Sequence, residues 1–339
     1  MTRSVILIML AALSLSVAAC GGVEVKNGET PPETSLVPSP EADLLWNAAQ
    51  ALETEGDRGG ALNRYQELVD EYPDSPRAPE AQFRIGVCLE AEDDLYEAFE
   101  AYQLLLDEFP GKGNLGEILS RQYAIGEAFL NGRKRSFLFL RIRSGLGAAE
   151  EIFRTVVNNA TFSTVSPLAQ YGLGRALQEQ GDYEEAITEY EQVLANYPGT
   201  DVIPLALFKM GDCYYQIALQ SDYDPREVDR AIQYLEKFAQ RFPDHQDRPE
   251  AERKIAELVD LKAEKAYDIA RFYESEESAE GGRLYYQEIV DTYPDSSYAL
   301  PAREKLAALP EPAPGTDEGS GGEDAGVNPR TSLAENGED

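Results

Sequence analysis

The sequence has few of the side chains on which most catalytic and metal sites depend. Its 339 residues include one histidine and three cysteines. A Cys/His zinc site or a histidine-based acyl-transfer triad would need several of these four residues to converge. The sequence also lacks a Gly-rich phosphate loop, a metal-spaced cluster and a nucleophile elbow. We therefore predict a chain that is not an enzyme and that holds no metal or cofactor.

Basic residues are scarce as well. Lys and Arg total 30 against 62 Asp and Glu, which leaves a formal net charge of -32. Nucleic-acid binding depends on cations that replace the counterions of phosphates, so this balance argues against a nucleic-acid partner. Hydrophobic residues still make up 42% of the chain, which is enough apolar material for most of it to fold.

The first twenty residues have the pattern of an export signal. Arg3 precedes an apolar run over residues 5–17, which is too short to span a bilayer comfortably. The run ends in Val17-Ala18-Ala19-Cys20, which resembles the lipobox of bacterial lipoproteins. This resemblance implies that residues 1–19 are removed and that Cys20 carries the lipid, palmitate included. Gly21 in place of Asp implies the periplasmic face of the outer membrane as the location.

Two segments lack hydrophobic periodicity. Residues 20–41 are rich in Gly, Pro and polar residues and predict a flexible tether behind the lipidated cysteine. Residues 310–339 carry eight acidic residues against Arg330 and predict a disordered acidic tail. The folded body is therefore expected over residues 42–309.

An aromatic residue followed by proline punctuates this body at regular intervals. The pairs are Tyr72-Pro73, Phe109-Pro110, Tyr197-Pro198, Phe242-Pro243 and Tyr293-Pro294. Twelve residues before each proline lies a small residue, namely Ala61, Ala98, Ala186, Ala231 or Gly282. Eight residues before it lies Tyr65, Tyr102, Tyr190, Leu235 or Tyr286. These offsets match the tetratricopeptide repeat, in which each helical hairpin covers the apolar stripe of its neighbour.

The spacing predicts an all-α tetratricopeptide-repeat solenoid of about five to six helical hairpins with a C-terminal capping helix. The expected hairpins start near Ala42, Pro79, Leu119, Pro167, Pro204 and Ala263. Their first helices carry a small residue where two helices cross closely, at Ala49, Gly86, Gly126, Gly174, Gly211 and Ala270. Residues 248–274 keep helical spacing without an interrupting glycine and predict one long helix, and residues 298–309 predict the capping helix.

The C-terminal part carries a more specific resemblance. The long helix ends in Ala270-Arg271-Phe272-Tyr273 and is followed by Tyr285-Tyr286 and Tyr293-Pro294. With the early hairpin DRGGALNRYQELVDEYPDSP, this pattern resembles the BamD (YfiO) outer-membrane assembly lipoproteins over roughly residues 42–309. The resemblance implies a non-enzymatic scaffold that binds the periplasmic domains of the barrel-assembly outer-membrane protein and engages unfolded outer-membrane proteins. An envelope organiser that coordinates peptidoglycan synthesis or cell division is the alternative, but such a protein need not have the long helix.

An aromatic residue occupies the fifth position of every expected repeat. In this fold that position tends to face the concave groove. A row of rings there would offer apolar area to an extended peptide, and few side-chain bonds would lose rotational freedom on binding. The alternative is that the rings pack between adjacent hairpins. The candidate peptide-binding groove therefore consists of Trp46, Phe83, Tyr123, Tyr171, Phe208 and Tyr267.

One short segment contrasts with the acidic chain. Residues 133–143, RKRSFLFLRIR, hold five of the 30 basic residues, interleaved with apolar ones. Such a segment suits a membrane headgroup region or an acidic partner, and the alternative is an insertion that folds onto its own solenoid. The candidate contact residues are Arg133, Lys134, Arg135, Phe137, Phe139, Arg141 and Arg143.

The cysteines other than Cys20 are expected to pack in the core. Cys88 and Cys213 occupy equivalent positions in the second and fifth repeats. A disulfide between them would have to bridge two intervening repeats, which exceeds the Cα separation that a disulfide allows. The single histidine, His245, follows a helix-ending proline and is expected in a turn.

Overall fold

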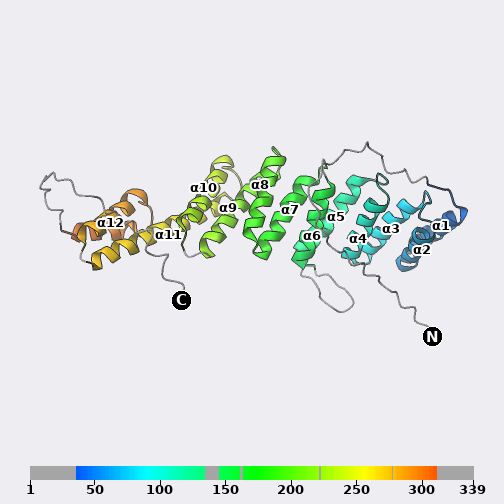
Figure 1. The fold of residues 1–339 in the computed structure, drawn as a ribbon, viewed down its shortest axis with the longest axis horizontal. Helices are drawn as coiled ribbons and strands as arrows, with labels where there is room; N and C mark the ends of the chain where they lie inside the picture. The colour runs from blue at the N-terminus through cyan, green and yellow to red at the C-terminus, as the bar shows by residue number, and fades with distance from the viewer. Residues whose placement is uncertain (1–35, 134–144, 161–162, 221–222, 277, 311–339) are drawn as a thin grey trace, which may run out of the picture. The chain divides into compact units, whose positions relative to one another are not determined.

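The computed structural model describes residues 36–133, 145–160, 163–220, 223–276 and 278–310. All regular structure in these residues is α-helical, which confirms the predicted all-α repeat fold (Figure 1). The helices form six hairpins, α1/α2 to α11/α12, followed by the single helix α13. Their bounds are α1 Pro40–Glu55, α2 Arg58–Glu71, α3 Ala78–Ala91, α4 Leu95–Glu108, α5 Leu115–Leu130, α6 Gly145–Asn159, α7 Ser166–Gln180, α8 Tyr183–Asn196, α9 Val202–Gln220, α10 Pro225–Arg241, α11 Arg248–Ser275, α12 Ala279–Thr292 and α13 Ala299–Ala308.

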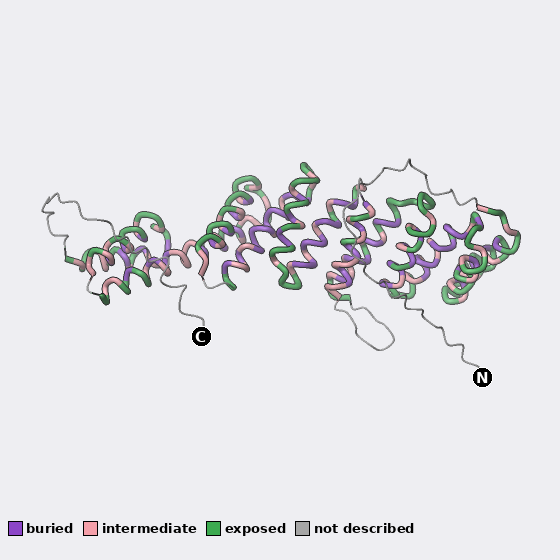
Figure 2. Tube along the Cα trace, viewed as in Figure 1, coloured by how far each residue is buried: buried purple, intermediate pink, exposed green. Residues whose placement is uncertain are grey.

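The chain divides into two compact units, residues 1–84 and residues 85–339. In the first unit α1 packs on α2, and the N–H of Val37 donates to the carbonyl of Asp74 at 2.7 Å. In the second unit each helix from α4 to α13 packs on the next, and the buried residues lie along the helix faces that meet (Figure 2). This pairing is the nearest-neighbour packing expected of a repeat array.

Local sequence explains where the helices begin and end. The side chains of Ser39, Asp57, Asn114, Asp224 and Ser278 each accept a backbone N–H in the first turn of their helices. The aromatic residue of every aromatic–proline pair is the C-cap of its helix. The proline behind it has no N–H to donate and cannot continue the helix, so the punctuation seen in the sequence marks hairpin ends.

Small residues let the two helices of a hairpin cross closely. A Cβ atom at Gly174 of α7 would lie 2.5 Å from the ring of Tyr190 on α8. At Gly126 of α5 it would lie 2.8 Å from the ring of Phe153 on α6. Real Cβ atoms do not approach a packed ring this closely, so the ring takes the space that glycine leaves.

The long helix and the capping helix are both confirmed. α11 runs unbroken for 28 residues, and α13 follows the last hairpin. The first half of α11 packs on α9 and α10, and its second half joins α12 and α13 in a separate core cluster. That cluster consists of Ala263, Ala266, Ala270, Tyr286, Ile289 and Ala302.

Cys88, Cys213 and His245 lie where the sequence analysis expected them. Cys88 and Cys213 both lie in the core, 2% and 0% exposed. His245 lies in the turn between α10 and α11, where its Nδ1 accepts the backbone N–H of Asp247 at 3.2 Å. Of the helices that the structure describes, none has an apolar stretch of the length needed to cross a bilayer.

Candidate functional site

Predicted groove rings lie against an aromatic ring on the second helix of their own hairpin. The ring centroids are 5.4 Å apart for Trp46–Tyr65, 5.7 Å for Tyr123–Phe153, 5.8 Å for Tyr171–Tyr190, 5.2 Å for Phe208–Phe238 and 5.3 Å for Tyr267–Tyr286. The sixth ring, Phe83 on α3, is half-buried. These contacts lie within hairpins, whereas the alternative drawn from the sequence placed them between hairpins.

The rings differ in how much surface they leave to solvent. Trp46 and Phe208 are 3% and 7% exposed, and the other four rings keep an intermediate exposure. Burial raises the pKa of Tyr123 and of Tyr171 to about 12, so both hydroxyls stay protonated at neutral pH. The Tyr123 hydroxyl donates to Glu127 at 3.3 Å. The partly exposed edges are the only part of the row that a peptide can reach, and the groove role stays a prediction.

A repeated relay of polar side chains joins successive hairpins. In the first unit, Tyr65 of α2 donates to the carboxylate of Glu53 on α1 at 3.0 Å, and Arg84 of α3 pairs with the same carboxylate. In the last hairpin, Tyr286 donates to Glu274 at 3.0 Å, and Lys305 of α13 pairs with that carboxylate at 2.9 Å. These donors lower the pKa of Glu274.

The ion pair between a carboxylate and a basic side chain, which is one part of the relay, recurs between the intervening hairpins. Arg121 of α5 pairs with Glu90 of α3 at 2.8 Å, and Arg175 of α7 pairs with Glu127 of α5 at 3.0 Å. All four side chains are between 24% and 31% exposed. Pairs this exposed contribute about 0–1 kcal/mol each, so they orient neighbouring hairpins more than they stabilise them.

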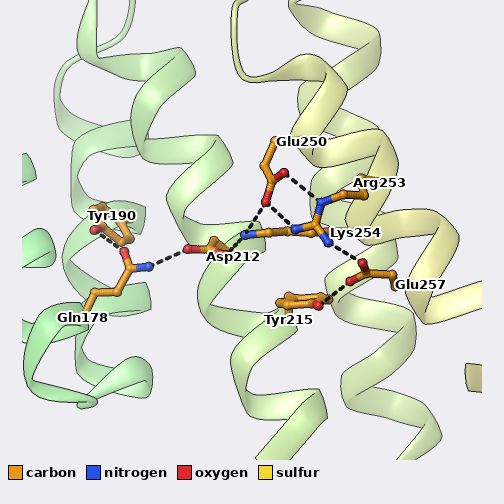
Figure 3. A network of polar contacts seen from close by, with 8 residues as sticks. All are labelled: Gln178, Tyr190, Asp212, Tyr215, Glu250, Arg253, Lys254 and Glu257. Atoms are coloured by element: carbon orange, nitrogen blue, oxygen red, sulfur yellow. Dashed lines mark hydrogen bonds and ion pairs between the residues drawn. The ribbon is translucent and has the colours of Figure 1, made fainter.

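In one place the relay is buried, where α7, α9 and α11 meet (Figure 3). The ammonium of Lys254 on α11 pairs with the carboxylate of Asp212 on α9, and the two residues are 7% and 8% exposed. Asp212 also accepts from the amide of Gln178 on α7 at 2.7 Å. The carbonyl of that amide accepts from the hydroxyl of Tyr190 on α8 at 2.9 Å. We call these four residues the α11 joint.

Charged residues of α11 surround the solvent side of the α11 joint (Figure 3). Glu250 lies 3.6 Å from the Lys254 ammonium and accepts from Arg253 at 2.5 Å. Glu257 accepts from the Tyr215 hydroxyl of α9 at 2.5 Å and also pairs with Arg253. Removing one partner of a buried ion pair costs about 3–5 kcal/mol, whereas replacing both with apolar groups is often neutral.

A surface groove of about 500 Å³ opens between the end of α3, the start of α4 and α5. The guanidinium of Arg121 contacts Glu90 at 2.8 Å and Glu117 at 3.2 Å, so both carboxylates on the groove edge already have a cation. The floor consists of small and medium apolar side chains, namely Leu95, Ala124, Ile125 and Ala128.

The last hairpin exposes large apolar side chains. Ile269 and Phe272 of α11 are 41% and 60% exposed, and Leu284 of α12 is 66% exposed. The ring of Tyr273 lies 5.8 Å from that of Phe272, and it stacks on Tyr285 across the two helices with centroids 5.7 Å apart and planes 12° apart. We call these five residues the C-terminal apolar surface. Large apolar side chains left exposed together mark interaction sites in soluble proteins.

Several predicted site residues lie outside the described residues. They are the lipidation site Cys20 and the basic-segment residues Lys134, Arg135, Phe137, Phe139, Arg141 and Arg143. Arg133, which precedes them, pairs with Asp93 at 2.5 Å. Lipidation and the membrane or partner contact therefore stay predictions.

The part of the chain that the structure describes contains no group of three or more His, Cys, Asp or Glu placed to hold a metal ion. Burial raises the pKa of the Cys213 thiol, because a thiolate is poorly solvated in the core. Cys213 is therefore a packing residue and a poor nucleophile.

Sequence reasoning missed the relay and the C-terminal apolar surface. The sequence contains a spacing that could have indicated the relay, since Tyr65, Tyr190 and Tyr286 each follow their hydrogen-bond acceptor by twelve residues. The exposed surface had a weaker signal, because Ile269, Phe272 and Tyr273 follow one another at helical spacing along one face of α11.

Two family models match the chain. Residues 143–281 match the YfiO model, described as an outer membrane lipoprotein, and residues 47–112 match a tetratricopeptide repeat model. Among curated proteins, the chain is similar to the outer membrane protein assembly factor BamD of Caulobacter vibrioides, with 26% identity over 131 residues. That match covers 39% of this chain and 43% of the relative, so it spans less than half of the relative's length. These findings support a BamD-like tetratricopeptide-repeat protein.

Solved structures with helical repeats are also similar. The MamA protein has a TM-score of 0.36 at 19% identity, over 60% of this chain and 92% of its own. YrrB, described as a TPR protein with an unusual peptide-binding site, has a TM-score of 0.36 at 19% identity, over 62% and 92%. Pseudomonas aeruginosa pilF has a TM-score of 0.32 at 16% identity, over 79% and 97%.

Proposed function

We propose that this BamD-like chain is a lipid-anchored scaffold on the periplasmic face of the outer membrane that takes part in the assembly of β-barrel proteins. The matched family is described as an outer membrane lipoprotein, and the curated relative is an outer membrane protein assembly factor. The lipobox at Cys20 supplies the anchor, and residues 20–41 supply the tether. The role is binding rather than catalysis.

The C-terminal apolar surface is the observation that carries this proposal. Phe272 and Leu284 are 60% and 66% exposed, although helices of this repeat fold normally bury such side chains on a neighbouring hairpin. A periplasmic domain of the barrel-assembly outer-membrane protein is the proposed partner for this surface. Aromatic side chains that become buried at the centre of an interface contribute a large share of its affinity.

Unfolded outer-membrane proteins are the proposed clients of the N-terminal hairpins. The half-buried edge of Tyr123 and the apolar side chains that line the groove beside α5 offer contact area to an extended chain.

A crosslinked pull-down from detergent-solubilised outer membrane tests the proposal. The wild-type protein should recover the barrel-assembly outer-membrane protein, and Phe272→Ser/Leu284→Ser should bind it about thirtyfold more weakly, because truncating an interface anchor costs about 2 kcal/mol. Leu104→Ser is the matched control, since Leu104 of α4 is also exposed, at 46%, but lies outside the surface. Recovery of peptidoglycan synthases without the barrel-assembly protein would overturn the proposal in favour of an envelope organiser.

A further inference from the structure

The α11 joint differs from the other contacts between hairpins in its burial. The side chains of Lys254 and Asp212 are 9% and 11% exposed, against 28% and 24% for Arg175 and Glu127. It also joins more elements, because Gln178 and Tyr190 extend it to α7 and α8 (Figure 3). One chain of polar contacts thus ties together the four helices α7, α8, α9 and α11.

Apart from the α11 joint, the first half of α11 is held by the buried side chain of Leu258 and by the hydrogen bond from Tyr215 to Glu257. The residues buried there are Ala251, Lys254 and Leu258. Alanine presents no large side chain to fit between those of a neighbouring helix, so it sets rotation weakly. Lys254 is held directionally, because its ammonium pairs with Asp212 and lies 5.5 Å from the ring centroid of Phe208.

Any rotation of α11 about its axis displaces the helices that pack on its second half. Its 28 residues form one continuous helix, and its second half shares a core with α12 and α13. A slip by one residue turns a helix by about 100° and moves it by about 1.5 Å. A helix packed about 10 Å from the α11 axis would then move on the order of 10 Å.

We propose that the α11 joint fixes the rotation of α11 and thereby the direction in which the last hairpin and its apolar surface point. A buried ion pair seldom adds stability over an apolar pair of similar volume, and its best-attested role is to select one arrangement among several. Lys254 and Asp212 are positioning residues in this account. The inference concerns the geometry of the joint and stands whether or not the proposed partner is correct.

Distance measurements by double electron–electron resonance test this inference on the full-length protein in detergent. One spin label replaces Glu236 on α10 and the other replaces Glu304 on α13, both at exposed positions. Burial shields Cys88 and Cys213 from the labelling reagent, and a preparation without the label cysteines gives the background from Cys20. The test variant is Asp212→Leu/Lys254→Met, which removes both charges at once.

The matched control is Asp229→Leu/Lys262→Met. This pair joins α10 to α11, whereas the test pair joins α9 to α11, and its side chains are 59% and 22% exposed. Wild type and control should give one narrow distance distribution, and the test variant should give a distribution shifted or broadened on the order of 10 Å with unchanged helicity. A wild-type distribution in the test variant overturns the inference, even if its melting temperature falls.

Asp212→Asn is the test variant for the same distance measurement if the double variant fails to fold. The amide keeps the size of the side chain and an acceptor for Lys254 but removes the charge. The inference expects a broadened distribution here too, and a wild-type distribution in folded Asp212→Asn would overturn it.

Discussion

Gly174→Ala tests the close crossing of α7 and α8. The added Cβ would lie 2.5, 2.8 and 3.0 Å from three atoms of the Tyr190 ring. Tyr190 is fully buried and its hydroxyl donates to Gln178 at 2.9 Å, so the ring has no free direction in which to move. The substitution therefore forces either the ring or the helix out of place.

The expected cost follows from two opposing effects. Adding a methyl group to a packed core costs about 1–3 kcal/mol, and three contacts this short place Gly174→Ala near the upper value. Alanine favours the helix over glycine by about 1 kcal/mol. The net loss should be about 2 kcal/mol, which lowers the melting temperature of a unit of this size by about 4–8 °C.

The assay combines thermal melting followed by circular dichroism with hydrogen exchange of the α7 and α8 amides, because a repeat array can unfold in parts. Gly116→Ala in α5 is the control in the same unit, since its Cβ would meet only the Asn114 side chain, at 3.5 Å. It should be neutral or stabilising by up to about 1 kcal/mol. If Gly174→Ala is as stable as wild type, the ring contact does not explain the glycine.

Three further predictions concern the rings, a buried acid and the basic segment. Tyr123→Ala/Tyr171→Ala should weaken the binding of an unfolded barrel-protein peptide, measured by fluorescence anisotropy below the melting range. Unchanged binding together with a large fall in melting temperature would show that the rings serve only in packing. Burial raises the pKa of Glu189, so its charge opposes folding at neutral pH. Glu189→Gln should therefore raise the free energy of unfolding at neutral pH, measured by urea titration. This gain should shrink as the pH falls through the raised pKa of Glu189, and it should vanish below about 4.3, the ordinary glutamate value. A gain that grows on acidification contradicts this prediction. Protein without its lipid should float with anionic liposomes, and less so after Phe137→Ser/Phe139→Ser; no flotation of either protein rules out the membrane contact.

The hairpin architecture was predictable because its signals are local. Aromatic–proline pairs end helices through backbone chemistry that does not depend on the rest of the fold, and each of the five aromatic residues is a C-cap. The long helix was predictable for the same reason, since nothing between Glu250 and Ser275 interrupts it. The small residues at Gly126 and Gly174 indicated close crossing, although not which ring fills the space.

The direction of side chains was harder to predict than the helices that carry them. An aromatic residue at a fixed repeat position has the same periodicity whether it faces a groove or the second helix of its hairpin, and Tyr171 packs on Tyr190. The buried partner of Lys254, Asp212, lies 42 residues away in the sequence. Such pairings depend on repeat lengths, and these vary along the chain. Phe272 is exposed because no later hairpin covers it among the described residues.

The most direct test of the assembly role is photo-crosslinking from the C-terminal apolar surface in intact cells. A photoreactive amino acid replaces Phe272 in one strain and Leu104, which is 46% exposed on α4, in another. The account predicts a crosslink between position 272 and the barrel-assembly outer-membrane protein that position 104 does not form. Crosslinks from position 272 to peptidoglycan synthases or division proteins alone would contradict it.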